Sequence, residues 1–277
     1  MDERFEILWF PTMRCNLRCS YCHFDMRADG SGFGGYGKDH ELGRELRWFE
    51  WLVYFSRLRP YKLELTGGEP TLWGDLPEFV AHIPEGCYWA VTSNTLAGVT
   101  GQVPLRRCTD WTASFHGKQL EKFTENLFRT ARAGLPPSVS LVATPDNLDE
   151  VERLLAHFEG KFRVNLLREL NPGVDWDGEN REDWIRLRDM AQAHKANLVV
   201  EEIPPSYDFP TWKTCDAGHK YICAAPDGTV YRCYSDMMLR PEEPMGHISD
   251  FEPLPPGSPC GKPCAGCAAD FRQKKAV

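Results

Sequence analysis

The chain has 277 residues, which favours one large or two modest domains and allows a substantial core without disulfides. Its 32 Lys and Arg against 40 Asp and Glu give a net charge of −8, so nucleic acid is not an expected partner. No apolar run reaches the roughly 18 residues that a membrane span needs, and no signal peptide opens the chain, so we expect a cytoplasmic protein with no membrane partner.

Short apolar runs alternate with longer amphipathic stretches over the first two thirds of the chain. This alternation is typical of strand and helix units around a parallel sheet, and it predicts an α/β fold. The expected strands are residues 5–10, 61–65, 88–92, 111–115, 139–144 and 162–167. Between them we expect a helix capped by Asp39, with Phe49 on its core face, and a last helix over residues 181–196.

The alternation ends near residue 205, after one more apolar run at residues 198–203. Pro204 and Pro205 interrupt it, and the remaining chain is rich in Cys, Pro and Gly. Within that tail, Pro226-Asp227-Gly228 separates two apolar runs, which predicts a β-hairpin. We therefore divide the chain into domains at residues 1–205 and 206–277.

Eleven cysteines are many for an intracellular chain, and clustered thiols there indicate metal or redox chemistry. Three of them, Cys15, Cys19 and Cys22, directly follow the first expected strand. Thiolates at this spacing can bind three irons of a cubane and leave the fourth iron without a protein ligand. A zinc site completed by His23 is the alternative, and the spacing alone does not decide between them.

A second motif, Thr66-Gly67-Gly68-Glu69-Pro70, follows the second expected strand. The C-x3-C-x2-C spacing, followed by this motif at the end of the next strand, resembles the radical S-adenosylmethionine (SAM) superfamily. The resemblance implies a partial (β/α)6 TIM-like barrel whose first three cysteines hold a 4Fe-4S cluster that chelates SAM. It also implies that Gly67, Gly68 and Glu69 bind the cofactor, since only a residue without Cβ lets the backbone approach the methionyl amine so closely.

Two later segments depart from the family pattern. Members often have Thr-Asn-Gly after the third strand, where this chain has Thr92-Ser93-Asn94-Thr95, and Asn94 is expected to contact the ribose and adenine edge of SAM. After the fourth strand the family usually places Ser and, two residues later, Asp, whereas this chain has Ser114 and His116. We expect Ser114 to reach the cofactor. His116 either faces the substrate or is only hydrogen-bonded within its loop.

The tail resembles the opening half of the SPASM domain, because Cys215, Gly228 and Cys233 have its spacing. The seven-cysteine ending is absent, so the tail is similar to the shortened "twitch" domain, which holds one auxiliary 4Fe-4S cluster. By that analogy the ligands are Cys215, Cys233, Cys264 and Cys267, with Cys260 as a spare ligand and Cys87, Cys108 and Cys223 as structural thiols. A four-cysteine zinc site is the alternative.

Arg168 and Glu169 follow the sixth expected strand, where barrel residues point at the active site. We expect Arg168 to contact the substrate, Glu169 to act as a base, and His116 to be a third catalytic candidate. The resemblance implies that an electron donor such as flavodoxin or ferredoxin drives cleavage of SAM to a 5′-deoxyadenosyl radical, which abstracts hydrogen from a substrate C–H bond.

With an auxiliary cluster, the expected net reaction is a two-electron oxidation, or dehydrogenation. The alternatives are peptide maturation by cross-link or thioether formation, redox-neutral epimerisation with Cys223 or Cys260 as hydrogen donor, and a non-enzymatic iron–sulfur electron carrier. Many relatives with peptide substrates carry a leader-binding domain before the barrel, whereas the first strand here is expected to begin at Phe5. This start favours a small-molecule substrate, with a peptide delivered by a separate leader-binding protein as the alternative.

Overall fold

The computed structural model describes residues 4–19, 21–22, 44–96, 103–168, 178–199 and 215–260. Within them, one sheet of ten strands has the order β10-β9-β8-β1-β2-β3-β4-β5-β6-β7. The strands from β8 through β1 to β7 pair in parallel. Strands β1 to β7 are Phe5–Trp9, Tyr61–Leu65, Tyr88–Ser93, Cys108–Phe115, Ser138–Ala143, Arg163–Arg168 and Asn197–Val199. The six strands expected from the sequence are therefore confirmed, with small shifts at their ends.

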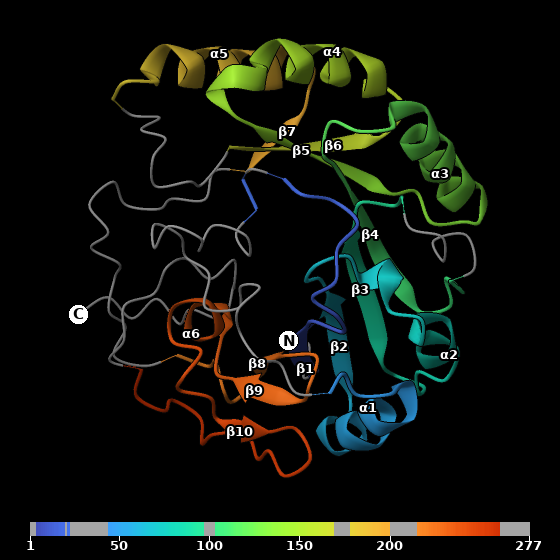
Figure 1. The fold of residues 1–277 in the computed structure, drawn as a ribbon, viewed down its shortest axis with the longest axis vertical. Helices are drawn as coiled ribbons and strands as arrows, with labels where there is room; N and C mark the ends of the chain where they lie inside the picture. Colours follow the sequence, from blue (N-terminus) through green and yellow to red (C-terminus); the bar gives the residue numbers. More distant parts are fainter. Residues whose placement is uncertain are drawn as a thin grey trace.

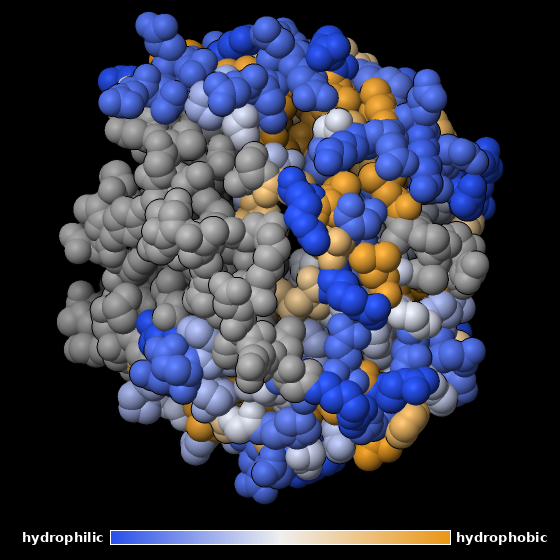
Figure 2. Space-filling view, in the orientation of Figure 1, coloured by the Kyte–Doolittle hydropathy of each residue, from blue (hydrophilic) through white to orange (hydrophobic). Residues whose placement is uncertain are grey.

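Five helices lie outside the sheet, with the strands on their inner side (Figure 1). They are α1 (Trp48–Phe55), α2 (Leu76–Ala81), α3 (Leu120–Arg132), α4 (Leu148–Phe158) and α5 (Arg181–Ala193). Three short 3-10 helices, Ser56–Leu58, Pro70–Leu72 and Pro145–Asn147, lie in the connections that the structure describes. Figure 2 shows hydrophilic side chains over the outer surface of α4 and α5, as expected of amphipathic helices. Among the residues the structure describes, no helix has the length and apolarity to cross a membrane.

The core between the sheet and the helices is rich in aromatic rings. Trp9, the last residue of β1, is fully buried. Its ring centroid lies between 4.5 and 5.5 Å from those of four neighbours, Trp51, Phe55, Trp73 and Phe79. Buried aromatic rings in edge-to-face contact add stability beyond their buried area. This cluster therefore fixes the end of β1, from which the first cysteine segment departs.

The first helix differs from the sequence expectation. Asp39 lies outside the described residues, residues 44–47 are not helical, and α1 begins at Trp48. Phe49, expected in the core, is 50% exposed and is a wrong prediction. Trp51 and Phe55 form the buried face of α1. Phe49 is two positions before Trp51 and therefore lies about 200° away around the helix, on the solvent side.

The hairpin expected in the tail is confirmed. Strands β8 (Tyr221–Ala224) and β9 (Thr229–Tyr231) pair antiparallel, and β10 (Gly246–His247) adds to β9. A short helix, α6 (Tyr234–Leu239), lies between β9 and β10 in the chain. The sequence did not predict that β8 would also pair in parallel with β1, where Glu6 lies opposite Tyr221. The hairpin thus extends the main sheet beside β1 (Figure 1).

Candidate functional site

The segment after β1 carries the first three cysteines, and we call residues 10–19 and 21–22 the cysteine loop. Cys15, Cys19 and Cys22 are all half-buried. Burial raises the pKa of the Cys15 and Cys19 thiols. Nearby negative charge raises it further, from Glu69 and then Cys22 at Cys15, and from Cys22 and Cys15 at Cys19. The three cysteines are therefore neighbours at the carboxyl end of β1.

Three cysteine thiols are a donor set that fits a 4Fe-4S cluster with one open iron, because each cysteine of a cubane binds a different iron. A tetrahedral zinc would need a fourth ligand beside them. Among the residues that the structure describes, no three Cys, His, Asp or Glu side chains are placed so that they could share one metal ion. His23, the alternative zinc ligand, lies outside the described residues.

The glycine motif lies directly against the cysteine loop. The backbone amide of Gly68 donates to Thr12 O at 3.3 Å, and that of Glu69 donates to Arg14 O at 2.7 Å. A Cβ on Gly68 would lie 2.4 Å from Arg14 O, and one on Gly67 would lie 2.7 Å from Thr12 O. Gly67 also has a φ of +119°, which L side chains rarely adopt. The chain's own close approach to the cysteine loop therefore requires both glycines.

Glu69 is a buried anchor between the ends of β2 and β3. Its side chain is 1% exposed and burial raises its pKa. Its carboxylate accepts hydrogen bonds from the backbone amide of Asn94 at 2.6 Å, from Ser93 Oγ at 2.7 Å, and from both the amide and hydroxyl of Thr71. These protein donors match the acceptor capacity of a carboxylate. Glu69, expected to bind the cofactor, thus has its oxygens engaged within the protein.

Asn94, at the end of β3, reaches the cysteine loop. Its Nδ2 donates to Asn16 Oδ1 at 2.7 Å, and its Oδ1 accepts from the backbone amide of Leu96 at 2.9 Å. The next residue, Thr95, has a φ of 57°, so it keeps the left-handed conformation that suits the glycine of the family pattern. Sequence reasoning placed Asn94 at the site and missed its partner Asn16.

Ser114 and His116 extend from β4 on the side away from the helices. Trp111, Ala113 and Phe115 are buried, and Ser114 is half-buried at the alternating position. His116 Nδ1 lies 3.0 Å from Tyr21 Oη, and the two rings are 5.9 Å apart. Burial lowers the pKa of His116 to about 4, so its imidazole is neutral at pH 7.

The contact between His116 and the cysteine loop was not predicted, because Tyr21 was not singled out from the sequence. The only signal for Tyr21 was its position between Cys19 and Cys22. The ends of β2, β3 and β4 thus all hold the cysteine loop, through the glycine motif, Asn94 and His116 respectively. The side chain of Arg168 and the whole of Glu169 lie outside the described residues.

Two of the four expected auxiliary ligands share one neighbourhood. Cys215 and Cys233 are half-buried and pack against the same small hydrophobic cluster. The members of this cluster are Phe10, Ala217, Tyr221, Cys223, Ala225, Tyr231 and Met237. Cys223 is fully buried, with its sulfur 3.4 Å from Tyr221 Oη, as expected of a packed thiol. Cys264 and Cys267 lie outside the described residues.

The two cysteine regions are neighbours. Phe10, the first residue of the cysteine loop, belongs to the hydrophobic cluster that contacts Cys215 and Cys233. Its ring stacks with Tyr234, directly after Cys233, at 6.5 Å between centroids. The pairing of β8 with β1 explains this proximity, because it sets the hairpin beside the strand that leads into the cysteine loop.

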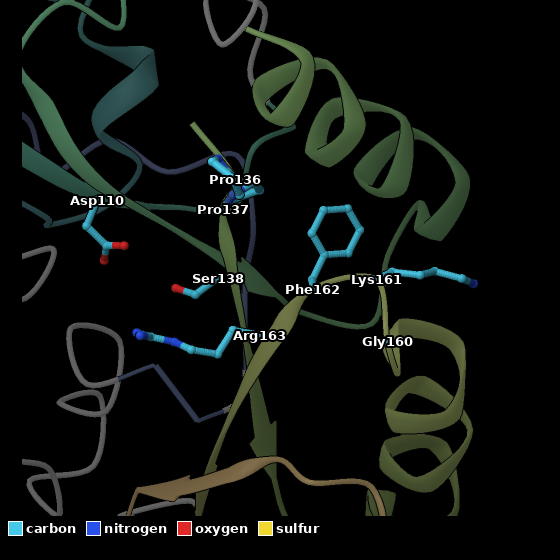
Figure 3. A pocket seen from close by; sticks show the side chains of 8 residues that line it. All are labelled: Asp110, Pro136, Pro137, Ser138, Gly160, Lys161, Phe162 and Arg163. Carbon is cyan, nitrogen blue, oxygen red and sulfur yellow. The ribbon is translucent and has the colours of Figure 1, made fainter. Parts of the chain in front are cut away.

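A separate hollow of about 360 Å³ lies at the amino ends of β4, β5 and β6. Figure 3 shows Asp110, Ser138 and Arg163 pointing to one side of these strands, with Phe162 and Lys161 on the other. The cysteine loop lies at the carboxyl ends of the neighbouring strands. The hollow is therefore not part of the candidate site.

Comparison with known proteins gives partial relatives. No protein-family model matches the chain. A "probable GTP 3′,8-cyclase" of Archaeoglobus fulgidus is 35% identical over 97 residues, which are 35% of this chain and 30% of that protein. A PqqA peptide cyclase of Granulibacter bethesdensis is 23% identical over 259 residues and covers 81% of this chain and 66% of that protein. The chain thus spans less than a third of the first relative and just under two thirds of the second.

Solved structures share the fold. SuiB of Streptococcus suis bound to S-adenosylmethionine has a TM-score of 0.60 at 14% identity, covering 90% of this chain and 62% of that one. The enzyme anSMEcpe with bound AdoMet has a TM-score of 0.58 at 16% identity, covering 88% and 78%. Both match its α/β fold with a parallel sheet. Together, these relatives and structural neighbours support the resemblance to the radical SAM superfamily that the cysteine and glycine motifs first indicated.

Proposed function

We propose that this protein is a radical SAM enzyme that oxidises a peptide substrate after abstracting hydrogen from one of its C–H bonds. The observation that carries the proposal is the set of three interacting thiols, Cys15, Cys19 and Cys22, which the ends of β2, β3 and β4 hold in place. Such a donor set leaves one iron of a cubane free for a substrate or cofactor.

In this proposal each part of the site has a role toward the cofactors. The three thiols hold the 4Fe-4S cluster, and the backbone of Gly67 and Gly68, together with Asn94 and Ser114, binds SAM. When bound and reduced by a donor such as flavodoxin or ferredoxin, the cluster and SAM supply a 5′-deoxyadenosyl radical that removes a hydrogen atom. Structural neighbours solved with S-adenosylmethionine support this choice of cofactor.

The peptide substrate is supported by the relatives that cover most of the chain. The PqqA peptide cyclase relative covers 81% of it. SuiB has been solved with its precursor peptide SuiA, and that structure has a TM-score of 0.63. The enzyme anSMEcpe has been solved with the Kp18Cys peptide. These comparisons favour the peptide alternative over the small-molecule substrate expected from the start of the first strand.

The oxidation requires the substrate to lose one hydrogen atom, one proton and one further electron. We propose Glu169 as the base that takes the proton, Arg168 as a substrate contact, and Cys215, Cys233, Cys264 and Cys267 as ligands of an auxiliary 4Fe-4S cluster. That cluster would supply an electron acceptor. The proximity of the two cysteine regions, joined by Phe10 and Tyr234, supports this arrangement.

The test begins with anaerobic reconstitution, iron analysis and a 5′-deoxyadenosine assay with dithionite and SAM. We expect about eight irons per chain in the wild type and about four in C15A, since each cubane holds four. C15A should form no 5′-deoxyadenosine. The matched control is C108S, because Cys108 begins β4 and its thiol donates to Asp110 O in the same strand, away from the cysteine loop. SAM cleavage by C15A at the rate of C108S would overturn the proposal.

The peptide assignment has its own readout. A short peptide encoded beside the gene is incubated with the reduced enzyme and analysed by mass spectrometry. Oxidation removes the mass of two hydrogen atoms from the peptide. Epimerisation leaves the mass unchanged in water and adds one deuterium in heavy water, and that result would replace oxidation with the redox-neutral alternative.

A further inference from the structure

Arg232, directly before Cys233, makes an unusual set of contacts. Its guanidinium donates hydrogen bonds to four backbone carbonyls. The bonds run from Nε to Ala217 O at 2.9 Å, from Nη2 to Cys215 O at 3.2 Å and to Ser258 O at 2.9 Å, and from Nη1 to Pro259 O. The four acceptors belong to only two stretches of chain, residues 215–217 and 258–259.

Each of these stretches contains or adjoins a cysteine. The first begins at Cys215, the second leads directly into Cys260, and Arg232 itself precedes Cys233. One planar group therefore joins three segments that carry tail cysteines and are separated by many residues in the sequence. Charged donors make stronger hydrogen bonds than neutral donors do. The Arg232 guanidinium can therefore offset part of the conformational entropy that is lost when these segments are held together.

A second set of contacts joins residues that flank these two stretches. The backbone amide of Leu254 donates to Gly218 O at 2.8 Å, and His219 Nδ1 lies 2.8 Å from Leu254 O. Gly218 has a φ of +83°, and a Cβ there would lie 2.7 Å from Leu254 Cδ1. The approach of residues 254–260 to residues 215–219 is thus a close-packed feature of the fold, with Arg232 at its centre.

We propose that Arg232 is a positioning residue for the auxiliary cluster, which rests on the proposed function above. It acts through the backbone carbonyls, holding the Cys215 and Cys233 segments beside residues 258–260. The fork of the guanidinium is essential to this role, because lysine offers three donors from a single nitrogen and cannot serve four carbonyls spread over two stretches.

The experiment uses the full-length chain with C15A, C19A and C22A combined, so that iron and electron paramagnetic resonance report only the auxiliary cluster. This parent should hold about four irons per chain. Adding R232Q or R232K should lower the iron content at least twofold and alter or remove the resonance signal of the reduced cluster. The control is K220Q, which removes a positive charge from the same region. The exposed Lys220 ammonium lies 3.8 Å from Asp216 Oδ2, a contact of little energetic weight.

Three outcomes would overturn the inference. R232Q with the iron content and resonance signal of the parent would show that Arg232 positions nothing, while the auxiliary cluster itself would stand. R232K with the parent's iron content would show that charge, and not the fork, is what matters. A parent without iron would remove the auxiliary cluster from the proposed function, and the role of Arg232 with it. Circular dichroism of the iron-free variants checks folding, and R232K remains informative if R232Q does not fold.

Discussion

The side-chain amide of Asn94 donates to the side-chain oxygen of Asn16 across 2.7 Å, and this bond joins the end of β3 to the middle of the cysteine loop. Asn16 lies between Cys15 and Leu17, and Leu17 is buried in the main core. The oxygen of the Asn94 amide is held by the backbone amide of Leu96, so its nitrogen faces the loop. The position of Asn16, and with it that of the adjacent Cys15, therefore depends on a residue 78 positions from Asn16 in the chain.

A double-mutant cycle tests this bond. We expect N16A to lower the free energy of unfolding by about 1 kcal/mol, and N94A by about 2 kcal/mol because it also leaves the Leu96 amide without its acceptor. The double variant should lose less than the sum, with a coupling energy of about 1 kcal/mol. Urea denaturation of the iron-free protein measures all four species. Additive losses would show that the two side chains do not interact.

Gly68→Ala should be severely destabilising. Its Cβ would lie 2.4 Å from Arg14 O and 2.5 Å from Met13 O, and both atoms are backbone, so the cysteine loop itself must shift. We expect a loss of about 3 kcal/mol or more in the free energy of unfolding, with a matching loss of iron at the first cluster. Gly74→Ala is the control, because nothing lies within 4 Å of a Cβ there. Equal stability of the two variants would contradict the close approach.

The neutral state of His116 predicts a pH dependence. Burial lowers its pKa to about 4 from an ordinary value of 6.5, so between these pH values the unfolded chain binds more protons than the folded one. The free energy of unfolding should therefore fall as the pH drops through this window, by at most about 3 kcal/mol from this residue. The H116N variant lacks this titration and should show a shallower fall between pH 7 and pH 4.5. Parallel curves would mean that His116 titrates normally in the folded protein.

The sequence predicted those features that have a local pattern. The strands were visible because each combines a short apolar run with flanking turn residues, and the cysteine and glycine motifs were visible because they follow such runs directly. Contacts between distant residues leave no such trace. Tyr21 and His116 are 95 positions apart, and the pairing of β8 with β1 brings Tyr221 opposite Glu6. Neither contact could be predicted from one sequence. Phe49 was misplaced because packing against Trp9, a residue distant in the sequence, makes Trp51 and Phe55 the buried face of α1.

The conformation of Thr95 leads to the last prediction. Its φ of 57° lies in the left-handed region, the residue is 1% exposed, and its buried hydroxyl has no hydrogen-bond partner among the residues that the structure describes. The left-handed conformation costs an L residue about 1 to 2 kcal/mol, and glycine avoids this cost. Glycine in turn gives the unfolded chain more freedom, which offsets up to about 1 kcal/mol of the gain.

We therefore expect T95G to raise the free energy of unfolding by about 1 kcal/mol, since it also removes an unsatisfied buried hydroxyl. The matched control is T130G, because Thr130 is helical and its Oγ1 donates to Asn126 O at 3.0 Å. That change should lower the free energy of unfolding by about 1 kcal/mol or more, from helix propensity and the lost hydrogen bond. Chemical denaturation of the iron-free variants measures both. A loss of stability in T95G equal to that in T130G would show that Thr95 is not strained.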